Sequence, residues 1–242
     1  MDFRIIDKYE EICEIVAVEI CSLIHQKKDA TICIAAGHSS LGVFDALLKM
    51  YHDGKVDFSE SCFIAMDEWL GMNEHISGSG GDFLRKNFLS KVNFREENIL
   101  LLNGCAEPIE DEITRISNYI ASHGGFDYMV LGMGMNGHLA LNEPGSDFDS
   151  TVRVTKLDPI TMKVGQKYFD STTATFICGF TIGLREICQT RRLVLVINGE
   201  RKAEMTKLLY ESPVTKSIPA TVLKNVENCT IYCDGTAASL IN

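Results

Sequence analysis

The chain has 242 residues, of which 45% are hydrophobic and 23% charged, as in a soluble globular protein long enough to bury a sizeable core. A formal net charge of −10 and a pI near 5.1, without a cluster of lysines and arginines, argue against nucleic acid as a partner, although a pocket of backbone N–H groups and one lysine can still hold a small anion. The N-terminus lacks a signal-peptide pattern and no apolar run approaches membrane-spanning length, so we expect a cytoplasmic protein with no membrane partner.

The first part of the chain alternates between helix and strand patterns. Apolar residues recur at helical spacing in the opening segment, which predicts an amphipathic helix that ends near Lys27 and Lys28. The stretch ATICIAAG then predicts a buried strand, and HSSLGVFDALLKMYHDG predicts a helix that Ser39 or Ser40 can cap. The apolar residues of the first helix are Ile12, Ile15, Val16, Ile20 and Leu23.

The alternation continues to the end of the chain. SCFIAMDEW, the apolar run in DYMVLGMG, RRLVLVING and CTIYCDG predict strands, whereas GDFLRKNFLSKV, EDEITRISNYIASHGG and ERKAEMTKLLYES predict helices. This order is typical of βαβ units. We therefore expect an α/β fold with a mostly parallel sheet and helices on both of its faces.

Residues 145–176 interrupt the pattern, because they lack a clean period and hold many small and polar residues. A long irregular stretch beside a presumed site is typical of a lid, with loose helix as an equal alternative. No repeat, low-complexity tract or linker divides the chain, so we expect a single domain over residues 1–242.

The nine cysteines are scattered mostly among apolar neighbours and form no CxxC pair. We expect reduced, buried thiols, and we predict neither a metal site nor a disulfide framework. The cysteines are Cys13, Cys21, Cys33, Cys62, Cys105, Cys178, Cys188, Cys229 and Cys233.

Two segments have the features of an anion site. In AAGHSSLG, residues 35–42, Gly37 permits close approach, Ser39 and Ser40 supply hydroxyls, and N–H groups at a helix N-terminus favour phosphate. An ordinary turn with a serine cap is the structural alternative.

Lys202 stands at the start of a predicted helix, where a cation is unfavourable for the helix dipole. A bound phosphate would explain that lysine, and a solvated lysine is the alternative.

Two carboxylates end the apolar strand of FIAMDEW. Partial burial would raise the pKa of either Asp67 or Glu68 toward the range that a general base needs. Alternation along a strand places the two on opposite sides, so at most one can face a given pocket. The structural alternative is that both are solvated, or that one caps a turn.

DYMVLGMGMNGHLALNEPG sets a histidine just past a predicted strand. A histidine side chain can exchange a proton in the neutral pH range, and Asn136 and Glu143 can hold the ring of His138 in one orientation. A lone histidine is more often structural than catalytic. Because this histidine lies in a glycine-rich segment at a strand end with a carboxylate close by, the catalytic and the structural interpretations are equally well supported.

These segments together resemble the glucosamine-6-phosphate deaminase family of amino-sugar-phosphate isomerases, over nearly the whole chain. The match consists of AAGHSS, MDEW, GMGMNGHLALNEPG, FTIGLREI and NGERKAE in the family's order and spacing. Within the family, DEW in place of the commoner DEY, together with NEPG, KLDPITM and SIPATVL, is more similar to the galactosamine-6-phosphate branch than to the glucosamine branch.

The resemblance implies a Rossmann-like, doubly wound fold and an aldose-to-ketose isomerisation with loss of ammonia, without metal or other cofactor. It identifies a small-molecule sugar phosphate as the partner and leaves a homo-oligomer open, because similar proteins occur as monomers and as hexamers. Asp67 matches the proton-shuttling aspartate, His138 the histidine that opens the sugar ring, and Glu143 the carboxylate that supports it. The matches to the phosphate-binding positions are Gly37, His38, Ser39 and Lys202.

Two positions depart from the family pattern. Many members have Asp where this chain has Asn136, and an amide can orient an imidazole but cannot offset its positive charge. The lid arginine that holds phosphate falls on Lys167, and a lysine cannot offer a bidentate fork.

The leading hypothesis is therefore the conversion of galactosamine 6-phosphate to tagatose 6-phosphate and ammonia. Glucosamine-6-phosphate deamination is the first alternative. A 6-phosphogluconolactonase, which is a hydrolase, is the second, but its pattern lacks NEP and it needs no base at C2. A sugar-phosphate sensor without turnover is the third, and it is opposed by the retention of Asp67, His138 and Glu143.

Overall fold

The structure is a computed structural model that describes residues 2–166 and 176–241. Its centre is a seven-stranded sheet in the order β1-β10-β9-β6-β2-β3-β5, and every neighbouring pair of strands is parallel. The strands are β1 (Asp2–Ile6), β2 (Thr31–Ile34), β3 (Cys62–Ile64), β5 (Ile99–Leu100), β6 (Tyr128–Gly132), β9 (Arg192–Ile197) and β10 (Cys229–Asp234).

The strand order reverses between β2 and β6, which lie side by side with Ile34 opposite Val130. From β2 the chain continues to β3 and β5 on one side, and from β6 it continues to β9 and β10 on the other. In open α/β sheets, ligands bind beyond the carboxyl ends of the strands at such a point. The topology therefore places a ligand crevice just past Ile34 and Gly132.

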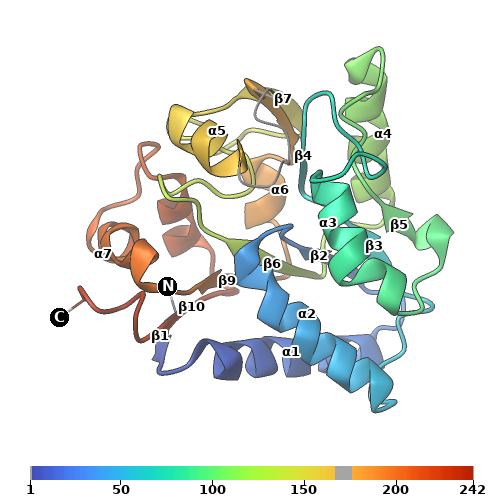
Figure 1. Ribbon diagram of the computed structural model, residues 1–242, viewed down its shortest axis with the longest axis horizontal. Helices are drawn as coiled ribbons and strands as arrows, with labels where there is room; N and C mark the ends of the chain where they lie inside the picture. Colours follow the sequence, from blue (N-terminus) through green and yellow to red (C-terminus); the bar gives the residue numbers. More distant parts are fainter. Residues whose placement is uncertain (1, 167–175, 242) are drawn as a thin grey trace.

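Helices flank the sheet on both sides. Figure 1 shows α1 and α2 (blue) on one side of the sheet and α4 and α6 on the other. The helices are α1 (Tyr9–Gln26), α2 (His38–His52), α3 (Gly80–Asn87), α4 (Ile109–Ser122), α5 (Pro159–Gly165), α6 (Leu184–Cys188) and α7 (Ala203–Glu211). Short 3₁₀ turns are η1 (Leu89–Lys91), η2 (Glu96–Asn98), η4 (Glu200–Lys202) and η5 (Pro219–Asn225).

The core lies between the sheet and its helices. Residues 128–131 of β6 and 193–197 of β9 are all buried, which is why these central strands appear in the sequence as unbroken apolar runs. Ile12, Val16 and Ile20 of α1 are fully buried, as their helical spacing predicts, whereas Ile15 is 37% exposed and lies outside this face. The predicted parallel α/β fold is thus confirmed.

A second sheet of three antiparallel strands lies beside the first. It contains β4 (Asp67–Trp69), β8 (Cys178–Thr181) and β7 (Arg153–Lys156), in the order β4-β8-β7. The prediction of one strand over SCFIAMDEW was therefore wrong. The chain leaves the large sheet after β3 and enters the small one, because its later residues find their hydrogen-bond partners in β8.

Two further local predictions were wrong. Gly37, not Ser39 or Ser40, is the N-cap of α2, and both serines lie within its first turn. The opening segment begins with strand β1 before the helix starts at Tyr9. An edge strand with mostly exposed side chains has no strong local period, and its pairing with β10 joins residues more than 200 positions apart.

The cysteines lie within the described residues and none forms a disulfide. Six are buried as predicted, Cys178 and Cys188 are half-buried, and Cys105 is exposed. None of the helices described by the structure is long and apolar enough to cross a membrane.

Candidate active site

A cavity of about 900 Å³ opens at the carboxyl ends of β2, β6 and β9, where the strand order predicts a ligand site. The loops that follow these strands, together with β4 and α5, form its wall. Of the residues singled out in the sequence, those that line it are Gly37, His38, Ser39, Ser40, Asp67, Glu68, His138 and Lys202.

The other predicted residues lie elsewhere. Asn136 and Glu143 are buried behind His138 and do not line the cavity. Lys167 lies outside the described residues, so its predicted contact with phosphate stays a prediction. Of the predicted lid, residues 145–166 and 176 are described, and they include β7 and α5.

Asp67 is the first residue of β4 and presents its carboxyl group to the cavity. Burial, with a smaller contribution from the charge of Glu68, raises the pKa of Asp67 from 3.8 to about 7. A carboxyl group with a pKa near neutrality can both accept and return a proton at physiological pH. Asp67 therefore has the property required of a general base.

Glu68 has a different environment from its neighbour. Its buried carboxylate accepts hydrogen bonds from the backbone N–H groups of Trp69, Gly80 and Gly81, at 2.9 Å, 3.0 Å and 2.9 Å. Gly80 and Gly81 begin α3, so the carboxylate satisfies N–H groups that have no acceptor within that helix. Both residues line the cavity, but the Glu68 carboxylate is used to anchor α3, which makes Asp67 the candidate base.

The His138 ring is fixed by a buried hydrogen-bond network on its Nδ1 side. Nδ1 lies 3.2 Å from Glu143 Oε2, and Asn136 Nδ2 donates to the same oxygen at 2.8 Å. Asn136 Oδ1 accepts the backbone N–H of His138 at 3.3 Å, so Asn136 braces the loop and the carboxylate and has no hydrogen bond to the ring. Burial raises the pKa of Glu143, but its hydrogen bonds and the His138 charge outweigh this effect and lower it. A carboxylate is thereby held against the imidazole.

Gly134 makes room for the imidazole ring. A Cβ atom at this position would lie 2.3 Å from His138 Nε2, and the next two nearest atoms also belong to that ring. Gly137, with φ of +82°, completes the turn between them. Ala140 lines the cavity with φ of +50°, and it is the one non-glycine residue with positive φ in the part of the chain that the structure describes. The glycines of this loop thus serve the placement of His138.

The predicted phosphate residues converge from two helices. Gly37, His38 and Ser39 lie at the N-terminus of α2, whose first N–H groups have no acceptor within the helix. Lys202 approaches from the N-terminus of α7 and donates to the backbone carbonyl of Met133. Burial lowers the pKa of this lysine from 10.5 to about 8. The arrangement can bind an anion of the size of a phosphate group.

Sequence reasoning did not single out several residues that line the cavity, of which Thr161, Trp69, Gly165 and Arg201 bear on its chemistry. Thr161 of α5 lies 3.0 Å from His138 Nδ1, and Trp69 packs against Gly165 of the same helix. Arg201 places a second cation at the cavity beside Lys202. Arg201 could have been predicted because it is adjacent to Lys202. The other residues could not, because their place at the cavity depends on how α5 packs against the rest of the protein.

Comparison with known proteins identifies the family and the fold of the chain. The sequence pattern of the glucosamine-6-phosphate isomerase and 6-phosphogluconolactonase family matches residues 7–232. The chain is 34% identical, over 241 residues and the full length of both chains, to a glucosamine-6-phosphate deaminase of Clostridium tetani. A monomeric glucosamine-6-phosphate deaminase of known structure is 28% identical, with a TM-score of 0.95 over 99% of this chain and 100% of that one.

A more distant likeness concerns the fold alone. The 6-phosphogluconolactonase of Thermotoga maritima is 18% identical, with a TM-score of 0.76, and the superposition covers 96% of this chain and 98% of that one. The same scaffold therefore carries both an isomerase and a lactonase.

Proposed function

This chain belongs to the family of glucosamine-6-phosphate isomerases and 6-phosphogluconolactonases, and from that premise we propose that it isomerises and deaminates a hexosamine 6-phosphate. One observation carries the proposal: the Asp67 carboxyl group and the His138 ring line a single cavity together with Lys202 and the N-terminus of α2. A lactonase needs a site for water attack but no base at C2. A carboxyl group with a pKa of about 7 therefore favours the isomerase.

The proposed reaction begins with the closed pyranose. His138 accepts the proton of the hydroxyl group on C1 and passes it to the ring oxygen, while the bond between C1 and the ring oxygen breaks to give the open aldehyde. Asp67 removes the proton from C2 and returns it to C1 through an enolamine, while a proton of the amino group is transferred to the C1 oxygen, which leaves an imine at C2. Water then hydrolyses the imine, so that the products are a ketose 6-phosphate and ammonia. Two proton-transfer groups suffice for these steps.

We propose galactosamine 6-phosphate as the particular substrate. Three of the segments that are similar to the galactosamine branch contribute residues at the site. DEW supplies Trp69 and KLDPITM supplies Ile160 and Thr161 to the cavity wall, and Ile218 of SIPATVL packs at Gly137. Glucosamine 6-phosphate is the competing substrate, because the relative from Clostridium tetani carries that name.

An assay with three substrates tests the proposal. Ammonia release is measured with galactosamine 6-phosphate and with glucosamine 6-phosphate, and acid release with 6-phosphogluconolactone. We expect ammonia from a hexosamine 6-phosphate, with a higher kcat/KM for the galactosamine compound. A higher kcat/KM for glucosamine 6-phosphate would reverse the choice of epimer. Activity confined to the lactone would refute the proposal of an isomerase. If none of the three compounds were turned over, the sugar-phosphate sensor would be the remaining hypothesis.

Replacing Lys202 should weaken substrate binding far more than turnover. Lys202→Met keeps the length of the side chain and removes its charge, so KM should rise by about tenfold to a hundredfold while kcat changes little. Because the pKa of Lys202 is about 8, the charge is present below that pH and is lost above it. The kcat/KM of the wild type should therefore fall above about pH 8, and Lys202→Met should lack this alkaline limb.

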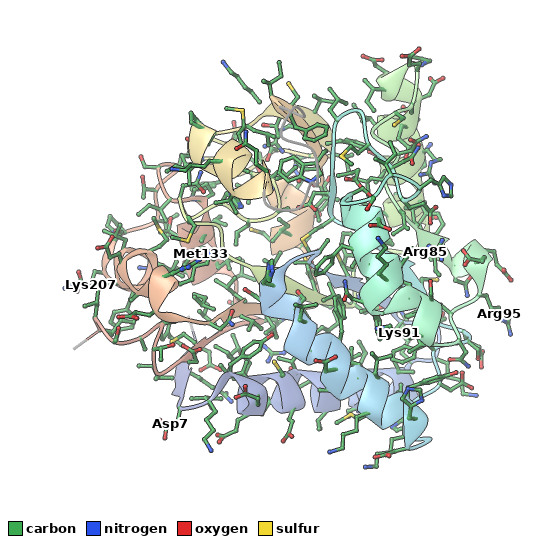
Figure 2. All side chains as sticks on the ribbon, in the orientation of Figure 1. Asp7, Arg85, Lys91, Arg95, Met133 and Lys207 are labelled. Atoms are coloured by element: carbon green, nitrogen blue, oxygen red, sulfur yellow. The ribbon has the colours of Figure 1, made fainter. Side chains whose placement is uncertain are left out.

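Lys207→Met is the matched control for this prediction. Lys207 belongs to α7, which Lys202 precedes, but it pairs with Glu211 at 3.8 Å, lies at the outer edge of the molecule (Figure 2) and does not line the cavity. Its KM should equal that of the wild type. Equal KM values for both variants would remove Lys202 from the phosphate site.

A further inference from the structure

We propose that Thr161 is a positioning residue, which holds His138 in the tautomer that carries hydrogen on Nδ1 and ties the histidine to helix α5. The inference rests on the proposed function for the role of His138, but the contacts that carry it belong to the protein alone. Thr161 is buried, and its hydroxyl oxygen lies 3.0 Å from His138 Nδ1. The hydroxyl also contributes to lowering the pKa of the Glu143 carboxyl group.

The tautomer follows from counting donors and acceptors around Nδ1. Glu143 Oε2 lies 3.2 Å from this nitrogen, and a carboxylate can only accept hydrogen bonds. If Nδ1 lacked hydrogen, its lone pair would face the carboxylate without a proton between them. With hydrogen on Nδ1, the nitrogen donates toward Glu143 Oε2 and toward the Thr161 hydroxyl oxygen. This arrangement gives Nδ1 two acceptors, whereas Glu143 Oε1 is buried without a hydrogen-bond partner among the described residues.

This tautomer leaves Nε2 as the acceptor on the ring. Nε2 lies over Gly134, where the missing Cβ atom makes room for it. Since the network occupies Nδ1, Nε2 is the nitrogen that remains to exchange a proton with a substrate in the cavity. Thr161 thus acts on the reaction through the orientation and tautomer of His138.

Helix α5 connects the two sides of the site. Its N-terminus is fixed because the Asp158 side chain accepts the N–H of Ile160 at 2.8 Å. Its last residue, Gly165, packs so closely on Trp69 that a Cβ atom there would lie 2.5 Å from the indole ring. Trp69 follows Asp67 by two residues in β4. The same helix therefore contacts His138 at one end and the Asp67 strand at the other.

Three variants distinguish the effect of the Thr161 hydroxyl group from the effect of side-chain packing. Thr161→Val keeps the shape and removes the hydroxyl, Thr161→Ser keeps the hydroxyl, and Thr155→Val makes the same change at a position in β7 outside the cavity. Nitrogen-15 NMR of the ligand-free protein reports the tautomer of His138, and its signals are assigned by their loss in His138→Gln. Thr161→Ala replaces Thr161→Val if the latter does not fold.

The wild type, Thr161→Ser and Thr155→Val should show His138 protonated on Nδ1. Thr161→Val should show a mixture of tautomers and a kcat lowered about tenfold with KM nearly unchanged, as expected for one lost hydrogen bond to a charged group. A wild-type tautomer and kcat in Thr161→Val would overturn the inference, and so would an equal loss in Thr161→Ser. If the wild type released no ammonia, the proposed function would fail, while the NMR result would still decide the tautomer.

Discussion

Asp67→Asn should lower kcat by ~10²–10⁴ and leave KM nearly unchanged, since a general base contributes a factor of this size and an amide cannot take the C2 proton. The amide has the same shape as the carboxyl group, so the cavity and the phosphate contacts should persist. The same pKa of about 7 sets the acid limb of the wild type. Its kcat/KM should rise with pH through about 7, where the carboxyl group loses its proton.

The stability of Asp67→Asn provides the control for folding. Because the pKa of the folded state, about 7, lies above the ordinary 3.8, the stabilising contribution of this carboxyl group is present below about pH 4 and is lost as the pH rises to 7. An asparagine has no such loss. The variant should therefore melt at a higher temperature than the wild type at pH 8, and the difference should shrink toward pH 4. Turnover within a few-fold of the wild type would eliminate Asp67 as the base.

Gly134→Ala should cost nearly as much activity as removal of the histidine itself, with kcat/KM lowered by about 10²-fold or more. The three atoms closest to a Cβ at this position, at 2.3 to 2.5 Å, all belong to the His138 ring. Since the backbone of Gly134 is not in the left-handed region, alanine fits the chain and displaces only the imidazole. A displacement of this ring breaks its alignment with both Glu143 and the substrate.

A double-mutant cycle tests whether the effect passes through the ring. In a His138→Ala background the obstacle is gone, so adding Gly134→Ala should lower kcat/KM no further. Gly235→Ala, at a glycine that does not line the cavity and where the nearest atom to a Cβ would lie at 3.5 Å, should behave as the wild type. Additive losses in the cycle would show that Gly134 acts on the loop and not on His138.

The parts of the site that sequence could predict are those with a local signal. Asp67 and His138 follow apolar strands directly, and glycines surround the histidine, so strand ends and turns were visible in the sequence. Lys202 was found because a cation at a helix start is unfavourable. Each of these signals lies within a few residues of the side chain concerned.

Other features depend on contacts between distant segments. Thr161 reaches His138 across 23 positions, and Glu68 binds Gly80 and Gly81 12 and 13 positions away. That contact assigns the Glu68 carboxylate to the anchoring of α3 and makes Asp67 the candidate base. Strand alternation predicted that at most one of the two faces a given pocket, but it could not say which of them is the base.

Local periodicity was sufficient for the α/β alternation, because a helix or a buried central strand shows its apolar pattern within one element. It was insufficient for β1, for the break between β3 and β4, and for the small sheet, whose partners lie far away in the chain. The shifted pKa values of the site residues also could not be predicted from local periodicity. The pKa of Asp67 is about 7 and that of Lys202 about 8 because folding removes both groups from water, and burial is a property of the packed molecule that no short stretch of residues contains.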